Sequence, residues 1–390
     1  MKDSARPCYT YPVQITDLPT PQVLVDRPRL LRNITRQQEA ATQHGLRLRP
    51  HAKTHKSPVI AAWQIGRGAV GICCAKVGEA EVFADAGVAD IRLPYPVNPA
   101  NASRVLALMD RAAISIIVDH LDVARTWSDV MRRAGRRLDV LIKVDVGFHR
   151  CGIDPHRVDA RGFVRAIAGM PGLNLRGLLS HAGQGYHASS EAELKQIADD
   201  EAALLAGVKA QAAEDGIPLE EVSVGSTPTF RFTLGQPGLT EIRPGNYVYY
   251  DRTQVSLGAA TPDDCALTVL AMVVSKPAPD RIILDSGSKT LTTDGARGLD
   301  KPAGHGAIIT DVSSTPASAV IDPSLVIERL SEEHAVVKVT TGSTPLEPGD
   351  RVRVIPNHSC VVSNLVDRIR LVDGPVVLDT LPVAARGKIS

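Results

Sequence analysis

Aromatic residues, cysteine and net charge are all scarce in this sequence. Phe, Trp and Tyr make up 4% of the 390 residues, and the formal net charge is +1. The balance of 44 Lys and Arg against 43 Asp and Glu supplies no basic excess for a polyanion, so we expect no nucleic-acid partner. No apolar run approaches the ~20 residues that span a bilayer, so we expect no membrane partner either.

Cysteines are few, and none forms a CxxC pair. This argues against a disulfide framework and predicts a reducing, cytoplasmic location. Residues 1–12 include charged side chains and no apolar core of a signal peptide, so we expect no secretory signal. The cysteines are Cys8, Cys73, Cys74, Cys151, Cys265 and Cys360.

The length of the chain exceeds what one hydrophobic core usually supports. Up to about residue 255, eight apolar or β-branched runs alternate with segments whose apolar residues have helical spacing. This alternation predicts a parallel sheet closed into a (β/α)₈ TIM barrel. An open doubly wound sheet is the alternative, but no GxGxxG motif follows the first strand. The predicted strands are 46–54, 69–75, 90–96, 114–119, 138–145, 174–182, 219–227 and 240–251.

Short β-rich runs separated by turn formers follow residue 255, and few helical periods remain. This pattern predicts a C-terminal, mostly antiparallel β domain. We therefore expect three parts: an N-terminal segment of residues 1–25 that pairs with the β domain, a barrel of residues 26–255, and a β domain of residues 256–390. The predicted strands of the β domain are 266–274, 281–285, 335–340, 351–356 and 368–372.

The segment RPHAKTHK, residues 49–56, is the most informative stretch. In an extended strand His51, Lys53 and His55 share one face, which in a barrel faces the lumen at the catalytic mouth. Desolvation and neighbouring imidazoles lower the pKa of a lysine, and a neutral amine is what Schiff-base formation needs. We therefore predict Lys53 as a catalytic amine, with His51 beside it. A solvated basic loop is the alternative.

Two turns of small residues end the seventh and eighth predicted strands: Gly225-Ser226-Thr227 and, after Arg243-Pro244, Gly245-Asn246-Tyr247. Glycine lets the backbone approach a ligand closely, and hydroxyls with free N–H groups suit a phosphate. In (β/α)₈ enzymes these two loops frequently build the phosphate site. A phosphate cradle and a reactive lysine fit pyridoxal 5′-phosphate (PLP). Taken singly, such a turn is more often a helix N-cap.

Two intermediate strands end in further candidates. Arg150 follows the fifth strand and could meet the phenolic oxygen of the cofactor. His181 and Tyr186 follow the sixth, where either could orient the lysine or act as a base. An ordinary surface ion pair for Arg150 and a hydrogen-bonded core histidine for His181 are the alternatives.

Near the end of the chain, His358 and Cys360 point the same way if the backbone is extended. Imidazole with thiolate suits Zn²⁺ better than Mg²⁺ or Ca²⁺, and two protein ligands leave open positions for water and substrate. The HxC pattern is unspecific, however. A buried Cys next to a His that bonds a backbone carbonyl is the alternative.

Taken together, these motifs resemble the fold-type III PLP enzymes, in particular the D-threonine aldolase and D-serine dehydratase group, over residues 20–390. The matching motifs are PHAKTHK (50–56), GICC (71–74) with EAE (79–81), DVG (145–147) with RCG (150–152), HAG (181–183), GSTPT (225–229), RPGNY (243–247), DSGSK (285–289), SEEH (331–334) and PNHSC (356–360).

The resemblance implies a role for each candidate. Lys53 carries PLP, Arg150 faces its ring oxygen, and Tyr186 lies near the substrate. His358 and Cys360 bind a divalent metal, with Zn²⁺ expected and Mn²⁺ and Mg²⁺ as alternatives. The family also implies a head-to-tail homodimer. Its phosphate site corresponds to Gly225, Ser226, Thr227, Gly245 and Asn246, next to Tyr247, and His181 completes the expected cofactor-binding set.

The second metal ligand divides the group, because aldolase-like members have His-x-Asp and dehydratase-like members have His-x-Cys. Cys360 and the run NYVYYD (246–251) therefore favour β-elimination from a D-3-hydroxy amino acid, giving a 2-oxo acid and ammonia. Retro-aldol cleavage to glycine and an aldehyde is the alternative. D-Serine, D-threonine and 3-hydroxyaspartate all remain open as substrates.

Two other interpretations are weaker. A racemase on this fold usually needs a second base, a Tyr of the β domain, and the sequence has no Tyr beyond residue 251. A non-enzymatic cofactor-binding protein would resemble the single-barrel members of the superfamily. The β domain with its HxC pair argues against that second interpretation.

Overall fold

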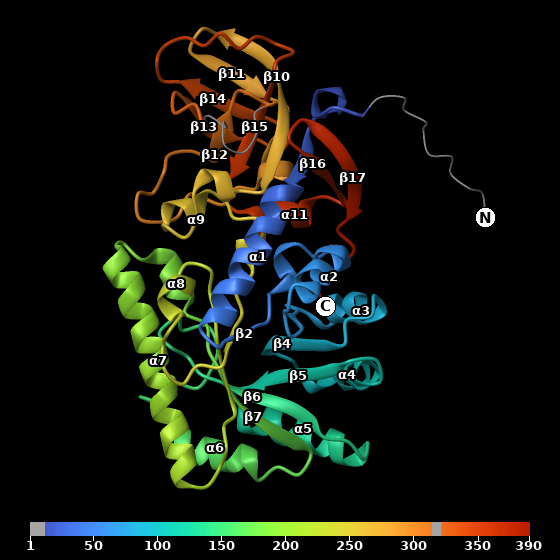
Figure 1. Cartoon of the computed structure of the whole chain (residues 1–390), viewed down its shortest axis with the longest axis vertical. Coiled ribbons are helices and arrows are strands. Elements are labelled where there is room, and N and C mark those ends of the chain that lie inside the picture. Colours follow the sequence, from blue (N-terminus) through green and yellow to red (C-terminus); the bar gives the residue numbers. More distant parts are fainter. Residues whose placement is uncertain (1–11, 314–320) are drawn as a thin grey trace, which may run out of the picture.

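A computed structural model describes residues 12–313 and 321–390 of the chain, arranged around two sheets (Figure 1). The first sheet holds eight strands, all parallel to their neighbours, in the order β2-β9-β8-β7-β6-β5-β4-β3. A parallel bridge between His51 and Cys73 joins the β2 and β3 ends, so the sheet closes into the predicted (β/α)₈ barrel. The strands are β2 (Arg47–Leu48), β3 (Ile72–Cys73), β4 (Asp90–Pro96), β5 (Ala113–Val118), β6 (Leu138–Lys143), β7 (Leu173–Leu179), β8 (Glu221–Val224) and β9 (Glu241–Ile242).

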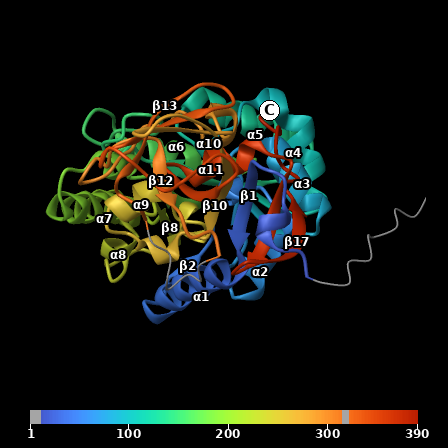
Figure 2. The same ribbon diagram turned by 90° about the horizontal axis from the view of Figure 1, so that it is seen from above.

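Helices follow the barrel strands and cover the outside of the ring (Figures 1 and 2). Their apolar stripes pack on the strands: in α5, for example, Ala124, Trp127 and Met131 are fully buried. The helices are α1 (Arg27–Gln43), α2 (Pro58–Gly66), α3 (Val77–Asp85), α4 (Ala102–Met109), α5 (Leu121–Arg133), α6 (Ala160–Ala168), α7 (Glu191–Glu214) and α8 (Phe230–Thr233).

The second sheet is mostly antiparallel, as the sequence predicts, and forms the β domain at the top of Figure 1. Its path runs β13-β14-β11-β10-β1-β16-β17, and β15 pairs with both β10 and β12. Its elements are β1 (Gln22–Asp26), α9 (Arg252–Ser256), β10 (Leu267–Ala278), β11 (Arg281–Leu284), α10 (Ser288–Leu291), β12 (Gly306–Ile309), β13 (Leu325–Leu330), β14 (Ala335–Val339), β15 (Arg351–Pro356), α11 (Ser359–Leu365), β16 (Arg368–Asp373) and β17 (Val376–Pro382).

The chain crosses between the two units at both of its ends. Strand β1 pairs antiparallel with β10 and parallel with β16, and α1 then descends from it to the barrel (Figure 1). At the other end, residues beyond β17 return to the barrel, where the N–H of Ala385 donates to the carbonyl of Lys56 at 3.0 Å. These crossings hold the β domain over the carboxyl ends of the barrel strands.

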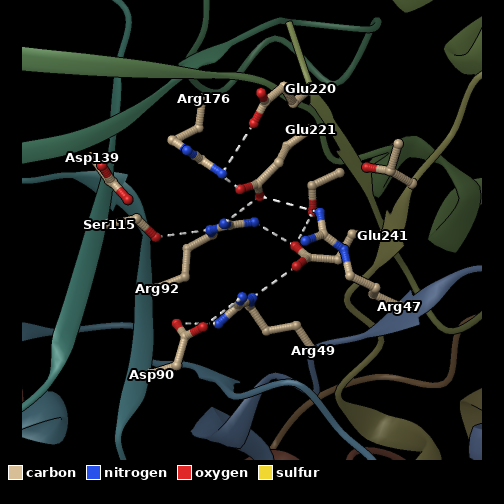
Figure 3. Close-up of polar contacts among 12 residues, drawn as sticks. Arg47, Arg49, Asp90, Arg92, Ser115, Asp139, Arg176, Glu220, Glu221 and Glu241 are labelled. Atoms are coloured by element: carbon tan, nitrogen blue, oxygen red, sulfur yellow. Dashed lines mark hydrogen bonds and ion pairs between the residues drawn. The ribbon is translucent and has the colours of Figure 1, made fainter.

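A buried ion network fills the opposite end of the barrel, where several strands begin (Figure 3). The carboxylate of Glu241 pairs with Arg49 and Arg92, and Arg92 also pairs with Glu221 at 2.7 Å. Each charge is buried but paired, which is the condition under which buried charges are tolerated. The hydroxyl of Ser223 donates to Glu241 at 2.6 Å and accepts from Arg243 at 2.8 Å. The network therefore also holds the side chain of Arg243 in place.

The first predicted strand, 46–54, is wrong because it extends too far along the chain. The expectation that His51, Lys53 and His55 share one strand face is therefore wrong as well. Strand β2 stops at Leu48, and residues Ala52–Thr54 form a 3₁₀ turn in which the carbonyl of Ala52 accepts from the N–H groups of residues 55 and 56. His55 therefore turns into the core, where its ring bonds Gln64 at 3.2 Å. Similarly, Pro244 interrupts the predicted strand 240–251, because proline has no N–H for the ladder.

Candidate active site

A cavity of about 530 Å³ lies at the carboxyl ends of the barrel strands, between the barrel and the β domain. Parallel barrels bind their ligands at this end. The structure brings residues from both units to its wall, although they are far apart in sequence. The predicted site residues that line it are His51, Lys53, Arg150, His181, Tyr186, Gly225, Ser226, Thr227, Gly245, Asn246, His358 and Cys360.

Lys53 projects into this cavity from the 3₁₀ turn after β2. The surrounding protein lowers the pKa of its amine by desolvation, and the charge of Arg150 lowers it further, while the thiol of Cys360 opposes the shift. A lowered pKa makes the neutral amine, which can act as a nucleophile or a base, easier to form. The structure places this amine at the mouth of the barrel, although the strand geometry from which that position was predicted is wrong.

Two imidazoles face the same space and are held neutral. Burial lowers the pKa of His51 and of His181 well below the ordinary value, and the charge of Lys53 adds to both shifts. The Nδ1 atom of His181 lies 2.6 Å from the carbonyl oxygen of Gly225. Because a carbonyl only accepts, Nδ1 carries the proton and Nε2 is left as an acceptor. Neutral imidazoles can take part in proton transfer without repelling a cationic lysine.

The two small-residue turns form a cradle that fits a phosphate. A side chain at Gly225 would lie 2.9 Å from the backbone nitrogen of Arg243, so the close packing there requires glycine. Within residues 12–313 and 321–390, the backbone N–H groups of Ser226, Thr227 and Asn246 donate to no protein acceptor, and the buried hydroxyl oxygen of Thr227 has no partner of good geometry. Buried donors and acceptors without partners indicate a bound polar group. The donor set suits the phosphate of PLP.

Three other residues were predicted to bind the cofactor, and their side chains lie in different surroundings. The guanidinium of Arg150 lies 5.1 Å from the ring centre of Phe148 and forms no ion pair within the described chain, which removes the surface ion-pair alternative. The side-chain amide of Asn246 is already bound to Asp251 at 2.6 Å. Tyr247 is turned away from the cavity, and its hydroxyl accepts from Gln64 at 2.9 Å in the core. The structure therefore does not bring the Tyr247 side chain to the site.

Tyr186 completes the wall on the side of the Gly225 turn. Its hydroxyl lies beside the side chains of Thr227 and Gln254, and burial raises its pKa, so the phenol stays protonated. The aromatic ring and the hydroxyl can position a ligand in the space between the phosphate cradle and Lys53.

His358 caps the start of α11, Cys360 lies in the first turn of that helix, and both line the cavity. Burial raises the pKa of the Cys360 thiol, but the neighbouring His358 outweighs it and lowers that pKa. In turn, burial lowers the pKa of His358, but the thiol, Asp251 and Asp294 raise it to about 10. Imidazole beside thiolate is a donor set for a borderline-soft divalent metal such as Zn²⁺. Among the described residues, no group of three or more His, Cys, Asp or Glu side chains could hold a metal ion, so His358 and Cys360 stand as a pair.

Several charged groups at this cavity were not predicted from the sequence. Arg243 forms part of the floor, and Lys143 is a second buried amine whose pKa is lowered to about 7 by burial. Asp251 accepts from both Asn246 and the N–H of Ser359, and so ties the phosphate cradle to the loop of His358. Asp294 contacts His358 from a loop of the β domain. For Arg243, Lys143 and Asp251, position at the end of a barrel strand was an available signal, whereas Asp294 had none.

The barrel, the small-residue cradle and the reactive lysine define a class, the fold-type III PLP enzymes. Residues 25–253 match the alanine racemase N-terminal domain family, and residues 266–372 match the putative serine dehydratase domain. The chain belongs to this family, in the group that includes D-threonine aldolase and D-serine dehydratase, and it is an enzyme.

Three similar proteins illustrate the group. D-Threonine aldolase of Arthrobacter sp. is 33% identical over 374 residues, which cover 94% of this chain and 93% of the relative. D-threo-3-hydroxyaspartate dehydratase of Delftia sp. is 32% identical, with 88% of this chain and 91% of the relative covered. D-Serine dehydratase of Dictyostelium discoideum is 27% identical, with 90% and 92% covered.

Solved structures agree with this assignment. A metal-free cysteine-to-alanine variant of D-threo-3-hydroxyaspartate dehydratase superposes with a TM-score of 0.87 at 29% identity, over 95% of this chain and 98% of that one. D-Threonine aldolase of Filomicrobium marinum gives a TM-score of 0.85 at 30% identity, over 97% and 99%. In the part of the chain that the structure describes, no helix has the length and apolar character to cross a membrane.

Proposed function

We propose that this enzyme is a PLP- and divalent-metal-dependent lyase that acts on D-3-hydroxy amino acids. The observation that carries the proposal is that Lys53 of the barrel and the His358–Cys360 pair of the β domain line one cavity. Such a lyase requires two groups: an amine that removes the Cα proton and a metal that polarises the 3-hydroxyl. The names of the relatives, which are aldolases and dehydratases of this substrate class, support it.

Each part of the cavity then has a task. The free N–H groups of Ser226, Thr227 and Asn246 would hold the phosphate of PLP, and Arg150 would face its ring oxygen. Bound PLP would supply an acceptor for the electron pair left at Cα, and the metal would polarise the 3-hydroxyl. His358 and Cys360 would hold that metal. We favour Zn²⁺ because of the thiolate, with Mn²⁺ and Mg²⁺ as alternatives.

Lys53 would remove the Cα proton. The lowered pKa of its amine favours the neutral form that a base requires. His51 lies beside it, with its Nδ1 atom 3.4 Å from the backbone nitrogen of Lys53, and can help to orient the turn. Tyr186 would position the substrate between this amine and the phosphate cradle. The β domain over the cavity would restrict access of water.

We favour β-elimination over retro-aldol cleavage. Loss of the Cα proton and of the 3-hydroxyl as water gives an enamine, which hydrolyses to a 2-oxo acid and ammonia. Cys360 supports this choice, since variants of the solved dehydratase replace a cysteine and a histidine two positions before it, and the cysteine variant is metal-free. Retro-aldol cleavage remains the second candidate, because D-threonine aldolase of Arthrobacter sp. is 33% identical over most of the chain.

The charges of the cavity favour an acidic substrate. Its carboxylates are already engaged, for example Glu79 with Lys56 at 3.1 Å and Asp294 with His358. Arg297 lines the cavity and is in no ion pair within the described residues. A carboxylate on Cβ would pair with this guanidinium. Among the candidate substrates we therefore favour 3-hydroxyaspartate.

Product analysis tests the proposal directly. With D-threonine, 2-oxobutanoate and ammonia would support the dehydratase, whereas glycine and acetaldehyde would support the aldolase. D-Serine and D-threo-3-hydroxyaspartate assayed in parallel give the order of preference. Interconversion of D- and L-alanine without either product would overturn the proposal in favour of a racemase.

We also propose a head-to-tail homodimer and a cytoplasmic location. The dimer follows from the family resemblance and is tested by light scattering of the purified enzyme. The location is supported by the cysteines, because the five in the described chain are all free, and Cys8 lies outside it.

A further inference from the structure

The loop between α10 and β12 reaches across to the His358–Cys360 pair. It carries Asp294, whose carboxylate oxygen Oδ2 lies 2.5 Å from Nδ1 of His358. Both side chains are about one-third exposed, so the pair stands at the wall of the cavity and not in the core. Asp294 itself lines the same cavity.

The backbone on both sides is fixed, so this contact is built into the fold. The side-chain amide of Asn357, next to His358, is buried and donates to the carbonyls of Asp294 at 3.1 Å and Gly304 at 3.0 Å. On the loop itself, Thr292 has a φ of 66°, which is rare for a β-branched residue. Its hydroxyl accepts from the N–H of Asp294 at 3.3 Å. A strained residue that is held in place beside a site is typical of a functional constraint.

The contact also decides which ring nitrogen of His358 is free. A carboxylate oxygen only accepts, so Nδ1 of His358 must carry a proton. The remaining nitrogen, Nε2, is then the one whose lone pair can bind a metal. Histidines that bind metals in proteins almost always have their other ring nitrogen held in this manner, which fixes the orientation of the ring and raises its basicity.

We propose that Asp294 is a positioning residue that orients His358 for the divalent metal and sets its tautomer. The inference rests on the proposed function, because it takes His358 and Cys360 as the metal ligands. It assigns a role in metal affinity to a loop of the β domain that none of the sequence motifs includes. Cys360 has further contacts of its own, to Thr54 at 3.2 Å and to Asn246 at 3.5 Å, whereas the contact of Asp294 is to the histidine.

The test measures metal affinity and not only turnover. The PLP-loaded enzyme is stripped of metal and titrated with Zn²⁺ against a chelating dye, for the wild type, Asp294→Ala and Asp294→Asn. We expect Asp294→Ala to bind Zn²⁺ about 10- to 100-fold more weakly. Asp294→Asn should recover part of the loss, because its amide oxygen can still accept from Nδ1. Asp300→Ala is the matched control, since Asp300 is on the same loop but lines a different cavity.

The outcomes are distinguishable. Equal Zn²⁺ affinity in the wild type and Asp294→Ala would overturn the inference and leave the proposed function intact. A loss beyond about 1,000-fold without recovery in Asp294→Asn would also overturn it, because it exceeds the usual effect of such a supporting residue and would make Asp294 a ligand. A wild type that binds no Zn²⁺, Mn²⁺ or Mg²⁺ would overturn both. Retained cofactor absorbance and circular dichroism show that each variant is folded.

Discussion

Replacing Glu241 by Gln removes the charge at the centre of the network that supports the barrel floor. The carboxylate is fully buried, and Arg49 donates to it at 2.8 Å. Burial would raise its pKa, but Arg92 and Arg49 outweigh burial and lower the pKa to about 2, from an ordinary value of 4.5. At about 1.4 kcal/mol per pKa unit, this shift corresponds to about 3 kcal/mol of stability at neutral pH.

The sign of the pH dependence follows from the lowered pKa. The contribution of Glu241 is fully present above about pH 4.5 and is lost as the pH falls towards about 2, because the native carboxylate must then be protonated. In Glu241→Gln this part of the acid dependence disappears. The arginines each keep a second partner, Asp90 for Arg49 and Glu221 for Arg92. We therefore expect a loss near the lower end of the 3–5 kcal/mol typical of a broken buried pair, about 3 kcal/mol.

Urea unfolding at neutral pH and at about pH 3 measures both effects. Asp90→Asn is the matched control, because the Asp90 side chain is 39% exposed and its loss should cost about 1 kcal/mol or less. A Glu241→Gln variant that loses less than about 1 kcal/mol, or that retains the full acid dependence of the wild type, would refute the reasoning.

Three other predictions concern the site. Lys53→Ala should lower turnover by about 10²- to 10⁴-fold, because it removes the amine that moves the Cα proton. Steady-state kinetics measure this effect, and near-normal turnover would exclude Lys53 as the base. Dialysis against a chelator should abolish activity on D-threonine and leave the cofactor absorbance unchanged, and activity that persists would remove the metal from the mechanism. Arg297→Gln should raise the KM for D-threo-3-hydroxyaspartate by about tenfold or more and leave that for D-threonine unchanged, and an equal effect on both substrates would count against the acidic preference.

The alternation of strands and helices predicted the barrel well, because hydrophobic periodicity follows burial directly. Strand β4 illustrates this, since its predicted range 90–96 and its observed range Asp90–Pro96 coincide. Strand ends were less predictable. Strands β2 and β9 end earlier than the apolar runs in the sequence predict. After β2 the chain forms the 3₁₀ turn that is closed by hydrogen bonds to the carbonyl of Ala52, and after β9 Pro244 interrupts the strand. Strands β12, β13 and β17 were missed, because β12 has only four residues and charged residues interrupt the apolar pattern of β13 and β17.

The candidate site was predicted best where function depends on short local motifs. The turn of Gly225 and the HxC pair are continuous in sequence and reach the cavity as expected. Tyr247 was assigned by proximity to such a motif, but its side chain packs in the core against Gln64. Asp294 lies 64 positions before His358, and only the fold brings the two together. Contacts of this kind cannot be found from local spacing.

The cavity contains two buried lysines with lowered pKa values, Lys53 and Lys143, and this offers the most direct test of the central claim. The enzyme is loaded with PLP, reduced with borohydride and digested, and the peptides are analysed by mass spectrometry. Our account predicts that the pyridoxyl phosphate adduct is on Lys53, with Lys143 unmodified. An adduct on Lys143, or no adduct on either lysine, would contradict it.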